Sequence, residues 1–175
     1  IYNYALDDKI QKKHFYQHQC ADVLSGFYKI NIKSKDHIDL KNRKRSKKNI
    51  TKYKKTINKK VVVNTITLDH FIKKKKIKHI NLLKLDTQGS EHRILQGTKK
   101  NLNKIDVIIT EIQFWDYYSH KSDFYNIEKI IRKHFELYDI SYIAKNPENF
   151  RTDYIDAIYV NKKFKANLID LFDFY

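Results

Sequence analysis

The chain has 175 residues, and its 36 Lys and Arg against 20 Asp and Glu give a formal net charge of +16. This length suits a single domain that buries a core without disulfides, and the lone cysteine, Cys20, excludes a disulfide framework. No apolar run approaches the roughly 20 residues of a membrane span, and the start does not resemble a signal peptide. We therefore expect a soluble protein of a reducing compartment, the cytoplasm.

The positive charge is mostly lysine and is unevenly distributed along the chain. Residues 41–60 hold 11 Lys and Arg and no acid, which predicts a solvated loop inserted at about residues 35–60. Such a segment can contact nucleic acid through charge alone, but no basic helix with base-reading side chains accompanies it. An excess of lysine over arginine is also what an A- and T-rich genome would give, whereas phosphate recognition favours arginine. A basic nucleic-acid-binding module that uses residues 41–60 is therefore an alternative function rather than the favoured one.

The first half of the chain predicts three strands and a short helix. Residues 1–6 are expected to form a strand that turns at Asp7, and residues 14–19 form a second, edge strand. Residues 61–66 are β-branched and continuous, as in a strand, and Thr67 can then cap a helix.

The second half alternates strands with helices. A nearly continuous apolar strand spans residues 80–86. A turn over residues 87–89 follows it, and a helix begins at Ser90. Later segments predict strands over residues 107–112, 135–140 and 154–160, and helices over residues 127–134 and 168–175. Buried strands that alternate with helices are typical of an α/β domain with a mostly parallel sheet. The last two strands have no helix between them, which predicts an antiparallel pair at the edge of that sheet.

Acidic side chains end two of the predicted core strands. Ligands of open α/β sheets bind beyond the carboxyl ends of the strands, which here carry Asp86 and Glu111. Lys84 shares a face with Asp86, and we expect their side chains to pair, because a lysine in a core strand needs a partner. Glu91 lies in the first turn of the following helix, where an anion is favoured. If the two strands are parallel neighbours, three carboxylates converge beside one lysine, which predicts an acid–base site.

Three other readings of these polar residues stay open or are weaker. Glu91 can instead be a helix cap, with Lys84 and Asp86 as a purely structural ion pair. His14, His18 and Cys20 fall on one side of the chain, but a tetrahedral metal site needs a fourth ligand, so no metal is predicted. The aromatic segment of residues 113–120 either faces a substrate or covers the structure below it.

One motif in residues 80–113 has a family resemblance. A hydrophobic strand ends in Lys-hydrophobic-Asp, followed by a variable pair, Gly, a small residue, Glu and a later Leu-x-Gly. The residues in these positions are Lys84, Asp86, Gly89, Ser90, Glu91, Leu95 and Gly97. This pattern resembles the signature half of the FkbM family of S-adenosylmethionine-dependent methyltransferases. Residues 63–72 resemble the segment before this strand, and residues 1–8 resemble the end of the family's third core strand.

The resemblance implies a Rossmann-like methyltransferase fold with S-adenosylmethionine as the cofactor. The acceptor would be a small molecule or glycan, with the methyl group placed on a hydroxyl of a sugar, glycan or other metabolite. It places Ala5, Leu6 and Asp7 near the adenine and Asp86 near the reactive centre. Asp86 or Glu111 would accept the hydroxyl proton, and Lys84 would position or tune that base.

The resemblance also implies that part of the fold lies upstream. The family's glycine-rich cofactor loop should precede Ile1, so residues 1–175 are expected to be a single partial domain that lacks the first two strands. A catalytically inactive remnant of such an enzyme is the second alternative.

Overall fold

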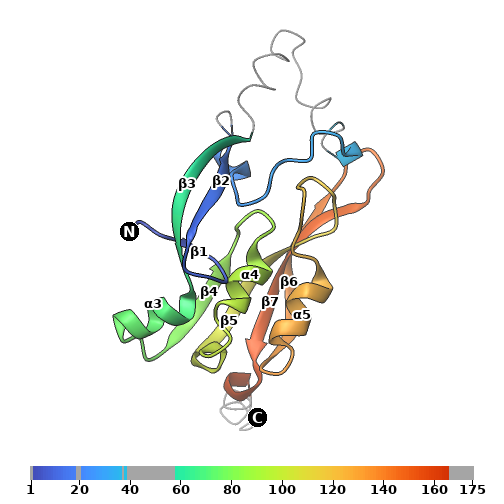
Figure 1. Cartoon of the computed structure of the whole chain (residues 1–175). Helices are drawn as coiled ribbons and strands as arrows, with labels where there is room; N and C mark the ends of the chain where they lie inside the picture. The colour runs from blue at the N-terminus through green and yellow to red at the C-terminus, as the bar shows by residue number, and fades with distance from the viewer. Residues whose placement is uncertain (1, 19–20, 37, 39–57, 166–175) are drawn as a thin grey trace, which may run out of the picture.

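The computed structural model of the chain describes residues 2–18, 21–36, 38 and 58–165. These residues form two sheets, one of three strands in the order β1-β3-β2 and one of four strands in the order β4-β5-β7-β6. Figure 1 shows the smaller sheet at the upper left of the ribbon and the larger sheet below it and to its right.

The three-stranded sheet is built around the β-branched segment. β3 (Lys59–Ile66) pairs in parallel with the short β1 (Ala5–Leu6) and antiparallel with β2 (Lys12–Gln17). The predicted second and third strands are confirmed with shifted ends, whereas the first is shorter than expected. The last two lysines of the Lys-rich block belong to β3, where they pair with Tyr16 and Gln17. Residues 39–57 of the expected inserted loop lie outside the described residues.

The helix that follows β3 has the expected cap. α3 (Leu68–Lys75) begins where the Thr67 side chain accepts a hydrogen bond from the His70 N–H. It ends at Lys76, whose φ of 54° closes the helix in the left-handed conformation. Its buried side chains, Leu68 and Ile72, face the rest of the protein, while its last turn consists of lysines.

The four-stranded sheet contains one parallel pair and two antiparallel pairs. Its strands are β4 (Ile80–Leu85), β5 (Ile105–Gln113), β6 (Phe135–Lys145) and β7 (Thr152–Asn161). β4 and β5 are parallel, whereas β7 is antiparallel to both β5 and β6. The predicted antiparallel pair of the last two strands is confirmed, although β7 lies inside the sheet and only β6 at its edge.

The prediction of a mostly parallel sheet is wrong for the described residues. Two strand pairs are parallel, β1 with β3 and β4 with β5, and three are antiparallel. The physical reason is chain connection, because β6 reaches β7 through a short turn and a direct turn can join only antiparallel strands.

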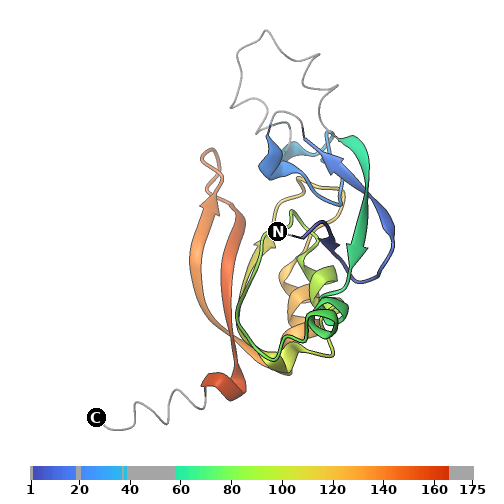
Figure 2. The ribbon, with the colours of Figure 1, turned by 90° about the vertical axis from the view of Figure 1, so that its left-hand side faces the viewer.

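Two helices cover one face of the four-stranded sheet. α4 (Glu91–Gln96) and α5 (Phe124–Ile131) bury Ile94, Leu95, Ile127 and Ile131 against the sheet. The sheet residues in the same core are Leu85, Ile105, Ile108, Ile112, Phe135, Ile155, Ala157 and Tyr159. Figure 2 shows both helices on one side of this sheet, and no described helix covers the other side.

Two predicted helices differ from the structure in extent or coverage. α5 ends at Ile131, so the expected last position, His134, lies in the turn before β6, where its N–H donates to the Ile131 carbonyl. The predicted helix over residues 168–175 lies outside the described residues. Two short 3-10 turns span Asp22–Leu24 and Leu102–Lys104, and residues 162–165 after β7 are also helical.

β6 forms an exposed and irregular edge. Its pairing with β7 shifts register three times, between Leu137 and Asp139, between Ile140 and Tyr142, and between Ala144 and Lys145. Its exposed apolar side chains are Leu137, Tyr138, Ile140, Tyr142 and Ile143, which are between 39% and 63% exposed. The irregular pairing therefore falls on the strand that carries the most exposed apolar surface of this sheet.

The two sheets meet where the end of β1 packs on the end of α4. Gly97 has an ordinary helical-region backbone, but a Cβ atom on it would overlap the Asp7 carbonyl oxygen and also approach the Asp8 Cα. Only a hydrogen atom fits between α4 and the chain that follows β1. Gly97 is therefore required by close approach rather than by its φ angle.

We expect Gly97→Ala to destabilise the protein by roughly 3 kcal/mol, because the methyl group must displace backbone rather than a flexible side chain. Urea unfolding followed by circular dichroism measures this loss. Gln96→Ala, at the exposed neighbouring position on the same helix, is the matched control and should change stability by less than about 0.5 kcal/mol. Equal effects of the two substitutions would contradict the close packing of α4 on β1.

Candidate active site

A tight turn joins β4 to α4 and forms the centre of the site. Gln88 and Gly89 both have positive φ angles, 55° and 95°. Glycine takes this conformation without strain, and a Cβ on Gly89 would also press on the His120 carbonyl oxygen at 3.0 Å. Gln88 has no such freedom, so its backbone is held in an unfavourable region, which is a feature that clusters at functional sites.

Glu91 holds this turn together from the inside. Its Oε1 accepts hydrogen bonds from the Thr87 N–H at 2.7 Å, the Thr87 hydroxyl at 3.0 Å and the Gly89 N–H at 3.3 Å. The side chain is fully buried, and burial raises its pKa although these hydrogen bonds favour the ionised form. Glu91 therefore stabilises the turn before α4. This is close to the alternative interpretation, in which Glu91 is a helix cap and not part of an acid–base site.

Glu111 meets the turn from the neighbouring strand. Leu85 pairs with Thr110, so Asp86 and Glu111 follow directly on two parallel strands, although β5 continues to Gln113 and Glu111 therefore lies within the strand rather than at its expected end. Glu111 is 7% exposed, and burial raises its pKa from 4.5 to about 7. The nearby charges of Glu91 and Asp86 raise it further, against a 2.7 Å hydrogen bond from the Gln113 side-chain amide. The structure thus brings Asp86, Glu91 and Glu111 together.

Asp86 is the exposed member of these three acids. Its Oδ1 accepts a hydrogen bond from the Gln88 side-chain amide at 2.8 Å. The Gln88 side-chain oxygen in turn accepts a hydrogen bond from the Tyr118 hydroxyl at 2.6 Å. Gln88 and Tyr118 were missed from the sequence, because a glutamine in the variable pair of the motif and one tyrosine among many carry no signal of their own.

Lys84 does not form the predicted ion pair. Its side chain is exposed, and within the described ranges no salt bridge joins it to Asp86 or to another acid. The prediction assumed that both faces of β4 are covered, so that an unpaired ammonium would be costly. The described helices cover only the opposite face, and the Lys84 ammonium therefore reaches solvent.

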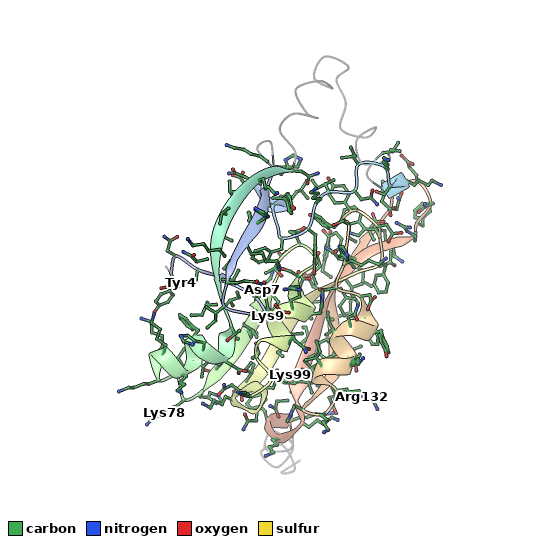
Figure 3. All side chains as sticks on the ribbon, in the orientation of Figure 1. Tyr4, Asp7, Lys9, Lys78, Lys99 and Arg132 are labelled. Carbon is green, nitrogen blue, oxygen red and sulfur yellow. The ribbon has the colours of Figure 1, made fainter. Side chains whose placement is uncertain are left out.

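The side chain of Asp7, expected near the adenine, is engaged elsewhere. Its buried carboxylate accepts hydrogen bonds from Arg93 at 2.7 Å and from Lys13 at 2.9 Å. Burial alone would raise the pKa of Asp7, but the hydrogen bonds from Arg93 and Lys13 outweigh it and hold that pKa below its ordinary value. Figure 3 shows Asp7 beside α4, which carries Arg93. Asp7 therefore fastens β1 to α4.

The other two residues expected near the adenine lie in β1. Ala5 pairs with Thr65 of β3, and Leu6 packs against the core of the four-stranded sheet. No described contact joins either residue to the three carboxylates. Their role in cofactor binding stays a prediction.

The aromatic segment of residues 113–120 is largely packed inward. Trp115 stacks on Tyr117 with ring centroids 4.7 Å apart, and Tyr117 and Tyr118 are buried together with Ile30. The segment thus covers the chain around Ile30, while its Tyr118 hydroxyl reaches toward Asp86 through Gln88 and its Gln113 amide bonds to Glu111.

A polar cavity of about 410 Å³ has Tyr118 in its lining. Carboxylate, amide, hydroxyl and guanidinium groups line it, among them Asn31, Ser34, Asp36, Asp116 and Arg151. Asp36 is buried and pairs with Arg151, and its Oδ2 accepts a hydrogen bond from the Asp116 N–H at 2.6 Å. The cavity is thus built by segments far apart in the chain.

No described cluster of three or more His, Cys, Asp or Glu side chains has an arrangement that could hold a metal ion. Of the three weak metal candidates, Cys20 lies outside the described residues, and the buried His18 makes other interactions. Nor is any described helix long and apolar enough to cross a bilayer.

Comparison with known proteins identifies the class. Residues 1–137 match the methyltransferase FkbM domain. The matched range includes the turn after β4, all of α4 and all of β5. The chain therefore belongs to the FkbM family of methyltransferases, as the motif in residues 80–113 predicted. No curated protein and no solved structure matches it.

The ion pairs of Asp7 predict an acid-sensitive stability. Because the folded-state pKa of Asp7 is lowered, its ion pairs stabilise the fold above the unfolded-chain value of 3.8 and are lost as the pH falls through the folded-state pKa. We expect Asp7→Asn to lower the free energy of unfolding by about 3 kcal/mol at pH 7. Urea titrations at pH 7 and pH 3 should show this difference shrinking in acid. A difference independent of pH would contradict the ion-pair explanation, and Asp22→Asn on the surface is the control.

Glu111 predicts the opposite pH dependence. Its folded-state pKa is raised from 4.5 to about 7, so its contribution to stability is fully present below pH 4.5 and is lost as the pH rises through 7. Glu111→Gln removes this penalty and should be more stable than the parent above pH 7, by up to about 3 kcal/mol. Thermal or urea unfolding between pH 4 and pH 9 measures the difference, and a parent chain as stable as the variant at pH 9 would overturn it.

Proposed function

We propose that this protein is an S-adenosylmethionine-dependent O-methyltransferase in which Asp86 is the general base. The observation that carries the proposal is an exposed Asp86 carboxylate just after the end of β4, beside the buried Glu111 near the end of the parallel β5. Family membership supplies the reaction class, and the two strand ends supply the place for it.

The acidic strand ends suit the charge of the proposed cofactor. When bound, S-adenosylmethionine supplies an electrophilic methyl group on a positively charged sulfur. The carboxylates of Asp86 and Glu111 lie close enough to influence each other electrostatically, and a cationic ligand there relieves their repulsion. Asp86 is the residue that would face this cation. The Asp7 carboxylate is already bonded to Arg93 and Lys13, so the expected adenine contacts would come from Ala5, Leu6 and the backbone of Asp7.

Exposure separates the roles of the three acids. A general base must reach the hydroxyl proton that it accepts, and Asp86 is exposed whereas Glu91 is fully buried. Glu91 also accepts three hydrogen bonds from the turn, so its place is structural. Glu111, with a pKa near 7, is partly protonated at neutral pH and keeps a second negative charge from forming in full beside Asp86. Lys84, exposed on the same strand, would act only through long-range charge.

Gln88 and Tyr118 orient the proposed base. The Tyr118 hydroxyl donates a hydrogen bond to Gln88, and the Gln88 amide donates one to Asp86. The Oδ1 atom of Asp86 is therefore held in place, and its Oδ2 atom is available to the acceptor. Alignment of the acceptor oxygen with the methyl group accounts for most of the catalysis in such a displacement. This hydrogen-bonded chain supports a fixed direction of approach.

The polar cavity beside Tyr118 supports a hydroxyl-rich acceptor. Its amide, carboxylate and guanidinium groups can exchange hydrogen bonds with several hydroxyls at once, and its volume of about 410 Å³ suits a sugar-sized molecule. An acceptor there would approach Asp86 past Tyr118, which lines the cavity and bonds to Gln88. A sugar, glycan or similar metabolite is therefore the acceptor class that we propose.

The test is Asp86→Asn in the full-length protein, assayed with radiolabelled S-adenosylmethionine and a panel of monosaccharides and oligosaccharides. We expect turnover to fall by at least about a hundredfold, because a general base contributes on that order, while calorimetry shows cofactor affinity within a few fold of the parent. Asp139→Asn, which removes an exposed carboxylate from β6, is the matched control and should keep full turnover.

Two outcomes would contradict the role of Asp86. Unchanged turnover in Asp86→Asn would exclude it as the base. Loss of cofactor affinity equal to the loss of turnover would show that Asp86 holds the cofactor and that another group accepts the proton.

A further inference from the structure

The end of the four-stranded sheet opposite Asp86 is strongly basic. Three connections lead into the starts of β4, β5 and β6, and one segment follows the end of β7, so all four lie at the same end. These segments are residues 73–79, 98–104, 132–134 and 162–165, and together they are called the basic end below. Their cations are Lys73, Lys74, Lys75, Lys76, Lys78, Lys99, Lys100, Lys104, Arg132, Lys133, Lys162, Lys163 and Lys165.

The basic end accounts for the whole positive excess of the described chain. The described residues hold 27 Lys and Arg against 17 Asp and Glu, and the basic end holds 13 of these cations and none of these acids. The other described residues therefore hold 14 cations against 17 acids, a net charge of −3. A lysine excess caused by codon composition alone would be spread over the surface, whereas here it is concentrated at one end.

Most of these cations are free to meet a partner. All but Lys104 and Lys165 are exposed, and across the described ranges only Lys165 forms an ion pair, with Glu136. The nearest acids are engaged, because Asp69 accepts hydrogen bonds from the Lys100 backbone N–H and the Asn101 side-chain amide, and Asp106 accepts one from the His79 ring. The fold thus gathers like charges without neutralising them, which costs stability and attracts anionic partners.

We propose that the basic end binds the surface of an anionic lipid bilayer. Figures 1 and 2 show the four segments spread across the whole lower end of the ribbon, and Figure 3 places Lys78, Lys99 and Arg132 along it. A bilayer surface contacts all four segments at once, whereas a nucleic-acid rod would contact such a broad end along one line.

The chemistry of the basic end agrees with this partner. Twelve of its thirteen cations are lysines, which act as hydrated point charges and need no fixed geometry at the phosphate. Binding of this kind adds over many lysines and requires no membrane-spanning segment. The candidate site lies at the other end of the same strands, so a chain docked in this way presents Asp86 to the aqueous side. The inference does not depend on the proposed reaction.

The experiment is co-sedimentation of the whole chain with vesicles of phosphatidylcholine alone or with an equal part of phosphatidylserine. We expect binding only to the vesicles that contain phosphatidylserine, and weaker binding as salt screens the charges. The variant K78E/K99E/K133E/K163E, with one exposed change in each segment, should lose affinity by at least about a thousandfold, since each lysine near the surface contributes about 1 kcal/mol. The neutralised version with Gln at the same positions should show a smaller loss in the same direction.

The matched control has the same net charge but leaves the basic end intact. K12E/K33E/K129E/K145E changes four exposed lysines on other elements and should bind within a few fold of the parent. Equal losses in the two quadruple variants would overturn the proposal, because binding would then follow net charge alone. Retained binding in the first variant, or tighter binding of single-stranded RNA or duplex DNA than of the vesicles, would also overturn it. Circular dichroism of each variant checks that the fold is kept.

Discussion

The parallel register of β4 and β5 is the constraint on which the candidate site depends. Leu85 lies opposite Thr110, and this pairing sets Asp86, just after the end of β4, beside Glu111, which lies two residues before the end of β5. A slip of one residue would turn every side chain of β4 to the other face of the sheet, moving Leu85 out of the core. The buried faces of both strands therefore fix the position of the acids.

Burial of acidic side chains at this point has an energetic cost that the surroundings only partly offset. Glu91 is partly compensated by hydrogen bonds from the turn to its Oε1, whereas Glu111 has a single amide donor and three negative neighbours. Gln88 adds backbone strain in the same turn. A structure selected for stability alone would place apolar or neutral residues here, so this local cost supports the proposed site.

Patterns within short segments were readable from the sequence. The β-branched run of β3, the cap at Thr67 and the apolar strand before Asp86 each depend on neighbours along the chain, and each is found in the structure. The FkbM motif was readable for the same reason, because its positions lie within one strand, turn and helix.

Features that depend on distant parts of the chain were not readable. Lys84 was expected to need a partner, but whether a strand face is covered depends on elements elsewhere, and the described helices leave that face open. Asp7 bonds to Arg93, which lies 86 residues away, and Tyr118 bonds to Gln88 across 30 residues. The concentration of lysines at one end was equally hidden, because four separate connections come together only in the folded sheet.

The irregular pairing of β6 has a consequence for how this chain behaves at high concentration. An open edge strand with apolar side chains offers its unpaired N–H and C=O groups to any other extended segment, and a straight edge would seed fibrous aggregates. Each register shift interrupts the even spacing of those groups and increases the local twist, so a second strand can match only a few residues before it loses alignment. The three irregularities therefore work as built-in protection against intermolecular β-sheet growth.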